Sequence, residues 1–225
     1  MQKFMLSIPD PSTMRVGKED YIQLPKGTEL HRIHRTKFGA TGFNSTPAGN
    51  ARFSPIRDKV GSIIPTIYAG QTFDCATCEI ILRSPDTPSV DKTTGLPTFQ
   101  IVFPSDFADY SHSVIRTTLE LNLVDLTVAG QRKIGVSHNA LLAGPRKTYP
   151  STRGWAEQIH SSCPHAQGIY YSSFQLGPRF ALLLFGDRMP ATALEERSTR
   201  LVVDKPCHDE IVSLANSLSI EYENV

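Results

Sequence analysis

The sequence predicts a mixed α+β fold, with a mainly antiparallel sheet as its core and helices beside it. Strand-like and helix-like segments intermix without the regular strand–helix–strand rhythm of a doubly wound protein. A Gly-Pro turn separates two strand candidates, residues 168–173 and 179–185, and this favours an antiparallel hairpin. The chain has 225 residues, of which 40% are hydrophobic and 20% charged, enough for one sizeable core. A single domain is therefore expected.

The first two strand candidates lie on either side of a long loop. Residues 30–35 read as a short strand, although polar side chains occupy both of its faces. Residues 36–62 are rich in Gly, Asn, Ser, Thr and Pro and predict a loop. Loops of this length in compact domains are usually functional or disordered. Residues 63–69 form the second strand candidate, which a glycine ends.

A helix follows directly after this second strand. Thr72 is a suitable cap, and the helix is expected to run through about Arg83. Apolar side chains recur on one face at spacings of three and four, at Phe73, Ala76 and Ile80. Strand, turn and helix together form the best-defined unit of the sequence.

The middle of the chain is less regular. Residues 84–97 form a polar loop with several prolines, and residues 98–103 are the next strand candidate. Within residues 113–126 leucines alternate with polar residues, which predicts a strand with one wet face. Residues 129–150 show no dominant period, so no element is predicted there.

The last third of the chain contains two more helix candidates around the hairpin. One helix opens at Ser151 or Thr152 and closes at Cys163, which precedes a proline. Of the two hairpin strands, residues 179–185 are apolar enough to be buried on both faces. An amphipathic helix over about residues 206–218 completes the domain.

Charge and composition argue against several classes of protein. Lys and Arg (23) nearly balance Asp and Glu (22), so no positive field attracts phosphate backbones and no direct nucleic-acid binding is expected. The apolar run at the N-terminus is too short for a signal peptide, and no later stretch could span a membrane. Four cysteines in such a chain do not suggest a disulfide framework, so cytoplasmic residence is expected. Neither glycine-loop motif for nucleotide phosphates occurs, so side chains must hold any nucleotide.

Two of the cysteines raise the alternative of a zinc site. Cys75 and Cys78 have CxxC spacing, and further ligands could come from Cys163, His165, Cys207 or His208. No second CxxC or HxxxH occurs, and the pair lies in an amphipathic helix, which favours buried thiols. A Cys/His nucleophile pair likewise lacks a local signature. We expect no metal, and a metal-dependent hydrolase stays as a competing class.

Glu79 has two interpretations. Arg83 lies four residues further on, and the two could form an exposed helical ion pair. The neighbours one turn away on the face of Glu79 are apolar, namely Cys75, Ala76 and Leu82. An apolar face turns inward, and an inward carboxylate needs a partner or a function.

An arginine, a tyrosine, a glutamate and a serine occur in an informative order. Taken singly, Tyr68 would be a core aromatic, and Arg32 and Arg52 are as readily surface cations as ligands. The motifs are His31-Arg32-Ile33-His34, Gly49-Asn50-Ala51-Arg52-Phe53, Ile67-Tyr68, the cap Thr72, Ala76-Thr77-Cys78-Glu79 and Gly168-Ile169-Tyr170-Tyr171-Ser172-Ser173. In this order, and with this interval between tyrosine and glutamate, the chain resembles the RES domain family over about residues 28–186. Residues 84–150 exceed a minimal RES domain and would be an insertion in a single domain covering residues 1–225.

The resemblance implies an enzyme that consumes NAD. RES proteins are toxins of toxin–antitoxin pairs that deplete NAD, and their fold is similar to that of ADP-ribosyltransferases. The chain would cleave the nicotinamide glycosidic bond of NAD as a glycohydrolase, or as a phosphorylase with inorganic phosphate as co-substrate, and would need no resident cofactor. The alternatives are an ADP-ribosyltransferase that modifies a protein and a non-catalytic partner-binding protein. The resemblance also implies an Xre-type helix-turn-helix antitoxin as partner, and is compatible with a homodimer.

The same resemblance assigns roles to the candidate residues. Glu79 would stabilise the ribosyl cation that forms when neutral nicotinamide departs. Arg32 would hold the diphosphate or the adjoining ribose through its planar fork of donors, with Arg52 as a second phosphate ligand. Tyr68 would pack against the nicotinamide ring.

The serine of the family motif falls on a doublet. Ser173 would orient the ribose or the amide, and Ser172 is the alternative. Strand alternation places Ser173 on the same face as Tyr171 and turns Ser172 away, so Ser173 is preferred.

Overall fold

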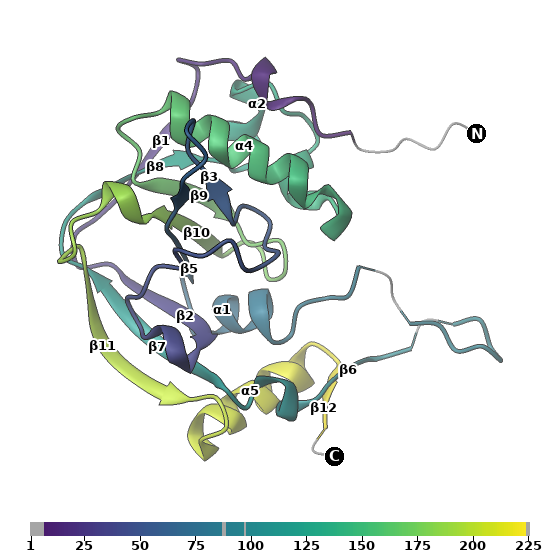
Figure 1. The fold of residues 1–225 in the computed structure, drawn as a ribbon. Helices are drawn as coiled ribbons and strands as arrows, with labels where there is room; N and C mark the ends of the chain where they lie inside the picture. Colours follow the sequence, from purple (N-terminus) through teal and green to yellow (C-terminus); the bar gives the residue numbers. More distant parts are fainter. Residues whose placement is uncertain (1–6, 87–88, 97, 224–225) are drawn as a thin grey trace.

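A strongly curled eight-stranded sheet forms the centre of the computed structural model, which describes residues 7–86, 89–96 and 98–223 (Figure 1). In spatial order its strands are β1 (Tyr21–Leu24), β8 (Leu121–Asp125), β9 (Gly168–Ser172), β10 (Phe180–Phe185), β5 (Thr66–Gly70), β2 (Glu29–Arg35), β7 (Tyr110–Thr117) and β11 (Leu194–Leu201). Strands β8 and β9 run parallel, and all other neighbours in this sheet run antiparallel. The predicted α+β class with a mainly antiparallel sheet is confirmed.

Two small ladders and five α-helices complete the described fold. The ladders join β3 (Ile56–Arg57) to β4 (Ile63–Ile64) and β6 (Gln100–Val102) to β12 (Ile220–Tyr222). The helices are α1 (Phe73–Ile80), α2 (Val128–Lys133), α3 (Ala140–Ala143), α4 (Tyr149–Ser162) and α5 (Lys205–Ser217). Single 3-10 turns cover Pro11–Thr13, Thr36–Phe38, Pro104–Phe107, Arg146–Thr148 and Gly186–Arg188.

The main sheet has a seam between β5 and β2. These two strands share one residue pair, His31 with Gly70. In contrast, every residue of β2 is paired with β7. The seam divides the sheet into a first half-sheet, made of β1, β8, β9, β10 and β5, and a second half-sheet, made of β2, β7 and β11. Because neighbouring strands are normally held by a ladder of backbone hydrogen bonds, β2 and β5 can diverge beyond this pair.

The helices lie on one face of the sheet, and the other face packs on itself. Helix α4 covers the first half-sheet through Trp155 and Ile159, and α5 packs on the second through Ile211 (Figure 1). Helix α1 contacts β2, β5 and β10 and therefore spans the seam. On the opposite face, leucines and isoleucines from strands of both half-sheets form one cluster without any helix residue. The curl of the sheet makes this possible, since a twisted sheet can close over its own apolar side chains.

Helix α1 forms for the reasons that the sequence suggested, but it is shorter than predicted. The Thr72 hydroxyl accepts a hydrogen bond from the Cys75 amide at 3.2 Å, as a helix cap does. Its inward face is fully buried from Cys75 to Cys78. The helix ends at Ile80 rather than near Arg83, because the Leu82 amide turns back to the Thr77 carbonyl and closes the last turn.

Three predicted strands are placed differently by the structure. Residues 113–126 are not one strand: β7 and β8 flank a turn and lie on opposite sides of the seam. Residues 63–69 are interrupted at Pro65, which lacks the amide proton that a ladder needs. The strand expected at residues 98–103 exists as β6 but pairs with β12, outside the main sheet.

The remaining predictions are close to what is observed. Helix α4 begins at Tyr149, two residues before Ser151, and Cys163 is its C-cap as expected. The hairpin of β9 and β10 is antiparallel, and β10 is buried along nearly all its length. Helix α5 begins one residue before the predicted start. Strands β1 and β11 were not predicted.

Candidate active site

A cavity that opens to solvent lies at the seam between the half-sheets. Its walls come from β2, the loop after β2, β5, one side of α1, and β9 with the segment that follows it. Charged or polar side chains on these walls include His31, Arg32, Arg52, Tyr68, Glu79 and Tyr171. Four of the six predicted site residues line this cavity, although they are far apart in the sequence.

Glu79 and Ser173 form the central hydrogen bond of the site. The Ser173 hydroxyl donates to Oε1 of Glu79 at 2.6 Å, and the Ser173 Oγ itself accepts a hydrogen bond from the Leu176 amide at 3.1 Å. Ser173 is buried, and Glu79 is half-buried on the cavity side of α1. Because the Ser173 hydroxyl accepts one hydrogen bond and donates another, its orientation is fixed, and it holds the carboxylate of Glu79 in place. The contact selects Ser173 over Ser172, which pairs with Phe180 at the end of β9.

Tyr68 supports the site by holding a loop. Its hydroxyl accepts a hydrogen bond from the Phe53 amide at 2.8 Å, which anchors the long loop after β2 to strand β5. Burial raises the pKa of Tyr68 and of its neighbour Tyr171, so both phenols are neutral at physiological pH. Tyr171 was not predicted as a site residue, although the alternation that favoured Ser173 places it on the same face.

Arg32 is a buried cation. Its Nη1 donates to the carbonyls of Gly39 at 3.0 Å and Ala40 at 2.6 Å. Its side chain is largely excluded from solvent, and this burial lowers its pKa to about 10, so it remains protonated at neutral pH. Within the described residues no carboxylate lies within 4.0 Å of its guanidinium. A buried positive charge without a negative partner is costly unless a ligand supplies one.

Arg52 is a second buried cation, held from a different side. Its Nη1 donates to the carbonyls of Leu141 at 3.2 Å and Gly144 at 3.0 Å, and its guanidinium lies 5.0 Å from the centre of the Tyr149 ring. Burial lowers its pKa, as for Arg32. In the part of the chain that the structure describes, Arg52 also has no ion pair. The loop after β2 thus brings a cation to the cavity that local sequence could not place.

Arg83 lies at the rim of the cavity and does not pair with Glu79. Its guanidinium stacks 5.6 Å from the centre of the Tyr149 ring and donates to the Tyr149 hydroxyl. Tyr149 therefore lies between two guanidiniums, those of Arg83 and Arg52. The sequence missed this arrangement because Tyr149 falls in a stretch without a predicted element. Among the residues that the structure describes, the Glu79 carboxylate therefore has no ion pair and is bound to a hydroxyl instead.

Comparison with known proteins identifies the family of this chain. The family model of the RES domain matches residues 29–205. The chain belongs to the RES domain family. All six predicted site residues of this RES domain fall within the matched span, and the resemblance seen in the sequence is confirmed.

A solved structure has the same fold. A chain of the M. tuberculosis MbcT–MbcA toxin–antitoxin complex aligns with a TM-score of 0.59 and 12% sequence identity, over 87% of this chain and 93% of that one. At 12% sequence identity, this structural similarity establishes the fold of the present chain and nothing further. No curated protein sequence matches the chain.

The cysteines of this RES domain are buried thiols in separate places. Cys75 and Cys163 belong to the core under α4, whereas Cys78 and Cys207 lie between α1 and α5. Burial raises the pKa of Cys75 to about 11 and that of Cys78 to about 12, so neither is a thiolate nucleophile at neutral pH. Among the residues that the structure describes, no three His, Cys, Asp or Glu side chains meet as a metal-binding group. No helix in the same residues is long and apolar enough to cross a membrane.

Proposed function

We propose that this RES domain cleaves the nicotinamide glycosidic bond of NAD and acts as the toxin of a toxin–antitoxin pair. One observation carries the proposal. A carboxylate held by a buried serine faces a cavity whose walls also contain two buried guanidiniums that pair with no carboxylate of the described chain. The cavity thus has a negative group at one point and unneutralised positive groups at others.

The guanidiniums match the diphosphate of a dinucleotide. In each arginine one terminal nitrogen donates to two backbone carbonyls, and this fixes the plane of the guanidinium. The remaining donors of Arg32 and Arg52 are available for oxyanions, which guanidinium forks bind in bidentate fashion. Binding a diphosphate would also relieve the cost of two buried cations, and so couples substrate affinity to their burial.

The carboxylate suits the chemistry of the glycosidic bond. Departing nicotinamide is neutral, so no general acid is required, and the ribosyl fragment becomes an oxocarbenium-like cation. Glu79 stabilises this cation electrostatically, and the hydrogen bond from Ser173 holds its carboxylate in place. Tyr68 and Tyr171 supply neutral aromatic walls for the departing ring.

The test follows nicotinamide release from NAD by the purified protein. Glu79→Gln keeps the size of the side chain and removes its charge, and Glu221→Gln, at an exposed position of β12, is the matched control. We expect release by the wild type and the control, and a loss of about 10²–10³-fold in the Glu79 variant. Absence of release by the wild type, with or without phosphate, would refute the proposal.

The same assay separates the acceptors. Release without phosphate indicates hydrolysis, and release that requires phosphate indicates phosphorolysis. Transfer of label from NAD to a protein would identify the alternative, an ADP-ribosyltransferase.

Toxicity and its control are part of the proposal. The structural neighbour comes from a complex described as toxin and antitoxin, and this supports an antitoxin partner for the present chain. We expect an Xre-type helix-turn-helix antitoxin, action in the cytoplasm where NAD is found, and a homodimer. Expression of the wild type should arrest growth, and Glu79→Gln should relieve the arrest. A variant that is inactive on NAD and equally toxic would instead favour a non-catalytic, partner-binding role.

A further inference from the structure

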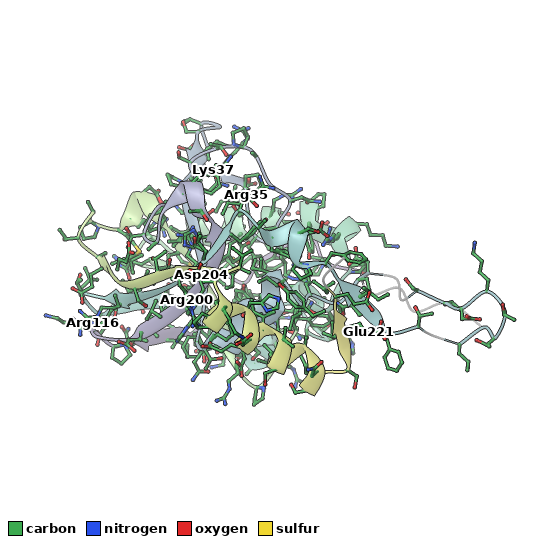
Figure 2. All side chains as sticks on the ribbon, turned by 90° about the horizontal axis from the view of Figure 1, so that it is seen from below. Arg35, Lys37, Arg116, Arg200, Asp204 and Glu221 are labelled. Atoms are coloured by element: carbon green, nitrogen blue, oxygen red, sulfur yellow. The ribbon has the colours of Figure 1, made fainter. Side chains whose placement is uncertain are left out.

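Three side chains form a hydrogen-bonded row across the second half-sheet and end at the cavity. Nε of Arg200 on β11 donates to Nδ1 of His112 on β7 at 3.2 Å. Nε2 of His112 lies 3.0 Å from Nδ1 of His31 on β2. His31 lines the cavity, whereas Arg200 lies near the first turn of α5 on the face shown in Figure 2. The row therefore connects the surface beside α5 with the candidate active site.

The two imidazole rings meet edge to edge. Their planes differ by 7° and their centroids lie 5.3 Å apart, although two of their nitrogens are only 3.0 Å apart. Face-to-face rings with such a short contact would have much closer centroids. The arrangement is instead that of an in-plane hydrogen bond between two ring nitrogens.

Arg200 fixes the proton positions along this row. A guanidinium can only donate, so Nδ1 of His112 must be the acceptor and carries no proton. A neutral His112 then has its proton on Nε2 and donates it to Nδ1 of His31. His31 in turn must keep its own proton on Nε2. Among the described residues, this Nε2 has no protein partner.

Arg200 itself is firmly held. Its two terminal nitrogens donate to the two carboxylate oxygens of Glu210 at 2.8 Å and 2.6 Å. Its guanidinium also lies 5.3 Å from the centre of the Phe73 ring, whose edge contacts His112. A bidentate ion pair and a stacked ring orient the Nε–H towards the histidine. Burial, with the charge of Arg200 next, lowers the pKa of His112 to about 3, in keeping with a neutral ring.

We infer that His31 is a substrate-binding residue that presents a neutral Nε2–H donor to an oxygen of the dinucleotide, and that His112 and Arg200 are positioning residues that set its tautomer. The inference rests on the proposed function for the identity of the ligand. A neutral donor differs from the arginines beside it, because it binds a hydroxyl or carbonyl oxygen without adding charge near the ribosyl cation.

The first test concerns the ligand-free protein and does not depend on NAD. Two-bond proton–nitrogen NMR spectra of histidine rings distinguish the two neutral tautomers, and His31→Gln and His112→Gln identify the two signals among the seven histidines. We expect both rings as Nε2–H forms in the wild type and mixed tautomers in Arg200→Met. Arg197→Met on the same strand is the control and should leave both signals unchanged. A proton on Nδ1 of either ring in the wild type would overturn the inference.

The second test measures NAD binding by calorimetry in the Glu79→Gln background, where no turnover consumes the ligand. His31→Ala should weaken binding about ten-fold, the value of one hydrogen bond. His31→Gln places an amide donor near the same point and should recover most of this loss, which a packing defect would not. Arg200→Met should weaken binding, and Arg197→Met should not. Equal binding by the wild type and His31→Ala contradicts the inference, whereas no binding in any variant contradicts the proposed function and leaves the tautomer result standing.

Discussion

The two walls of the cavity are built in opposite ways. On the α1 side, Glu79 takes its orientation from a single direct contact, the hydroxyl of Ser173. On the β2 side, His31 takes its orientation from a row that reaches through His112 to Arg200. The first wall presents an acceptor with a negative charge, and the second presents a donor without charge beside the Arg32 cation. The site thus separates the group that stabilises a cation from the groups that hold the ligand, and each can be altered alone.

Ser173→Ala is expected to have the largest effect of the following changes. Without its donor the carboxylate can rotate, and we expect nicotinamide release at saturating NAD to fall about 30-fold. In the Glu79→Gln background the same change should cost less than about three-fold, since residues that act as a pair are not additive. A full, additive loss would show that Ser173 acts independently of Glu79. Ser172→Ala tests the other hydroxyl, and an effect as large as that of Ser173→Ala would reverse the assignment.

His112→Gln should change how stability depends on pH. The pKa of His112 is about 3 in the folded protein against 6.5 for the free side chain, so below pH 6.5 the unfolded chain binds a proton that the folded one does not. The contribution of His112 to the free energy of unfolding is therefore fully present above pH 6.5 and is lost as the pH falls towards 3. This histidine should account for about 2 kcal/mol of that loss between pH 7 and pH 5. Urea unfolding at both pH values measures the difference, which should shrink by this amount in the variant; an unchanged difference would contradict a neutral His112.

Arg52→Lys tests whether the fork of donors matters beyond its charge. Lysine keeps the positive charge but cannot bind two carbonyls and a phosphate in one plane. We expect the Kd for NAD to rise about ten-fold, measured by calorimetry in the Glu79→Gln protein. Arg57→Lys, at an exposed strand position, is the matched control. Unchanged affinity in Arg52→Lys would mean that charge alone is recognised.

Arg83→Gln should have the smallest effect. Arg83 lies at the rim and is only half-buried, so its charge is partly screened by solvent. We expect the KM for NAD to rise about two- to three-fold with kcat unchanged, as for a residue that binds substrate and transition state equally. A fall in kcat comparable to that of Ser173→Ala would place Arg83 at the reacting bond.

The difference between the walls also explains what the sequence could predict. Tyr68 and Glu79 lie on one strand, turn and helix unit, where a cap and a regular apolar spacing fix the geometry locally. The family motif narrowed the serine to a doublet and strand alternation favoured Ser173, and in the structure Ser173 is the member that contacts Glu79. The family motif pointed to Arg32 and Arg52, but not to the carbonyls that hold them.

The row behind His31 was beyond the reach of sequence analysis. His31, His112 and Arg200 meet only because β2, β7 and β11 are neighbours in the sheet. That neighbourhood depends on strand pairing over long separations, and no local pattern encodes it. Residues 113–126 looked like one strand, and β11 carries charges on an exposed edge that do not resemble a strand pattern. Local periodicity therefore finds elements, whereas side chains that cooperate across elements need the fold.

The seam between β2 and β5 gives the proposed substrate a structural role. A single residue pair, His31 with Gly70, joins the two half-sheets there, and the cavity fills the place where further ladder hydrogen bonds would run. A dinucleotide held by Arg32 on one side and Tyr68 on the other would replace those missing bonds. Exchange of the backbone amides along the seam with deuterated solvent would then slow when NAD is bound, while the rest of the sheet stayed the same. In this sense the ligand would complete the sheet, which without it is joined across the seam by helix α1 on one face and by the apolar cluster on the other.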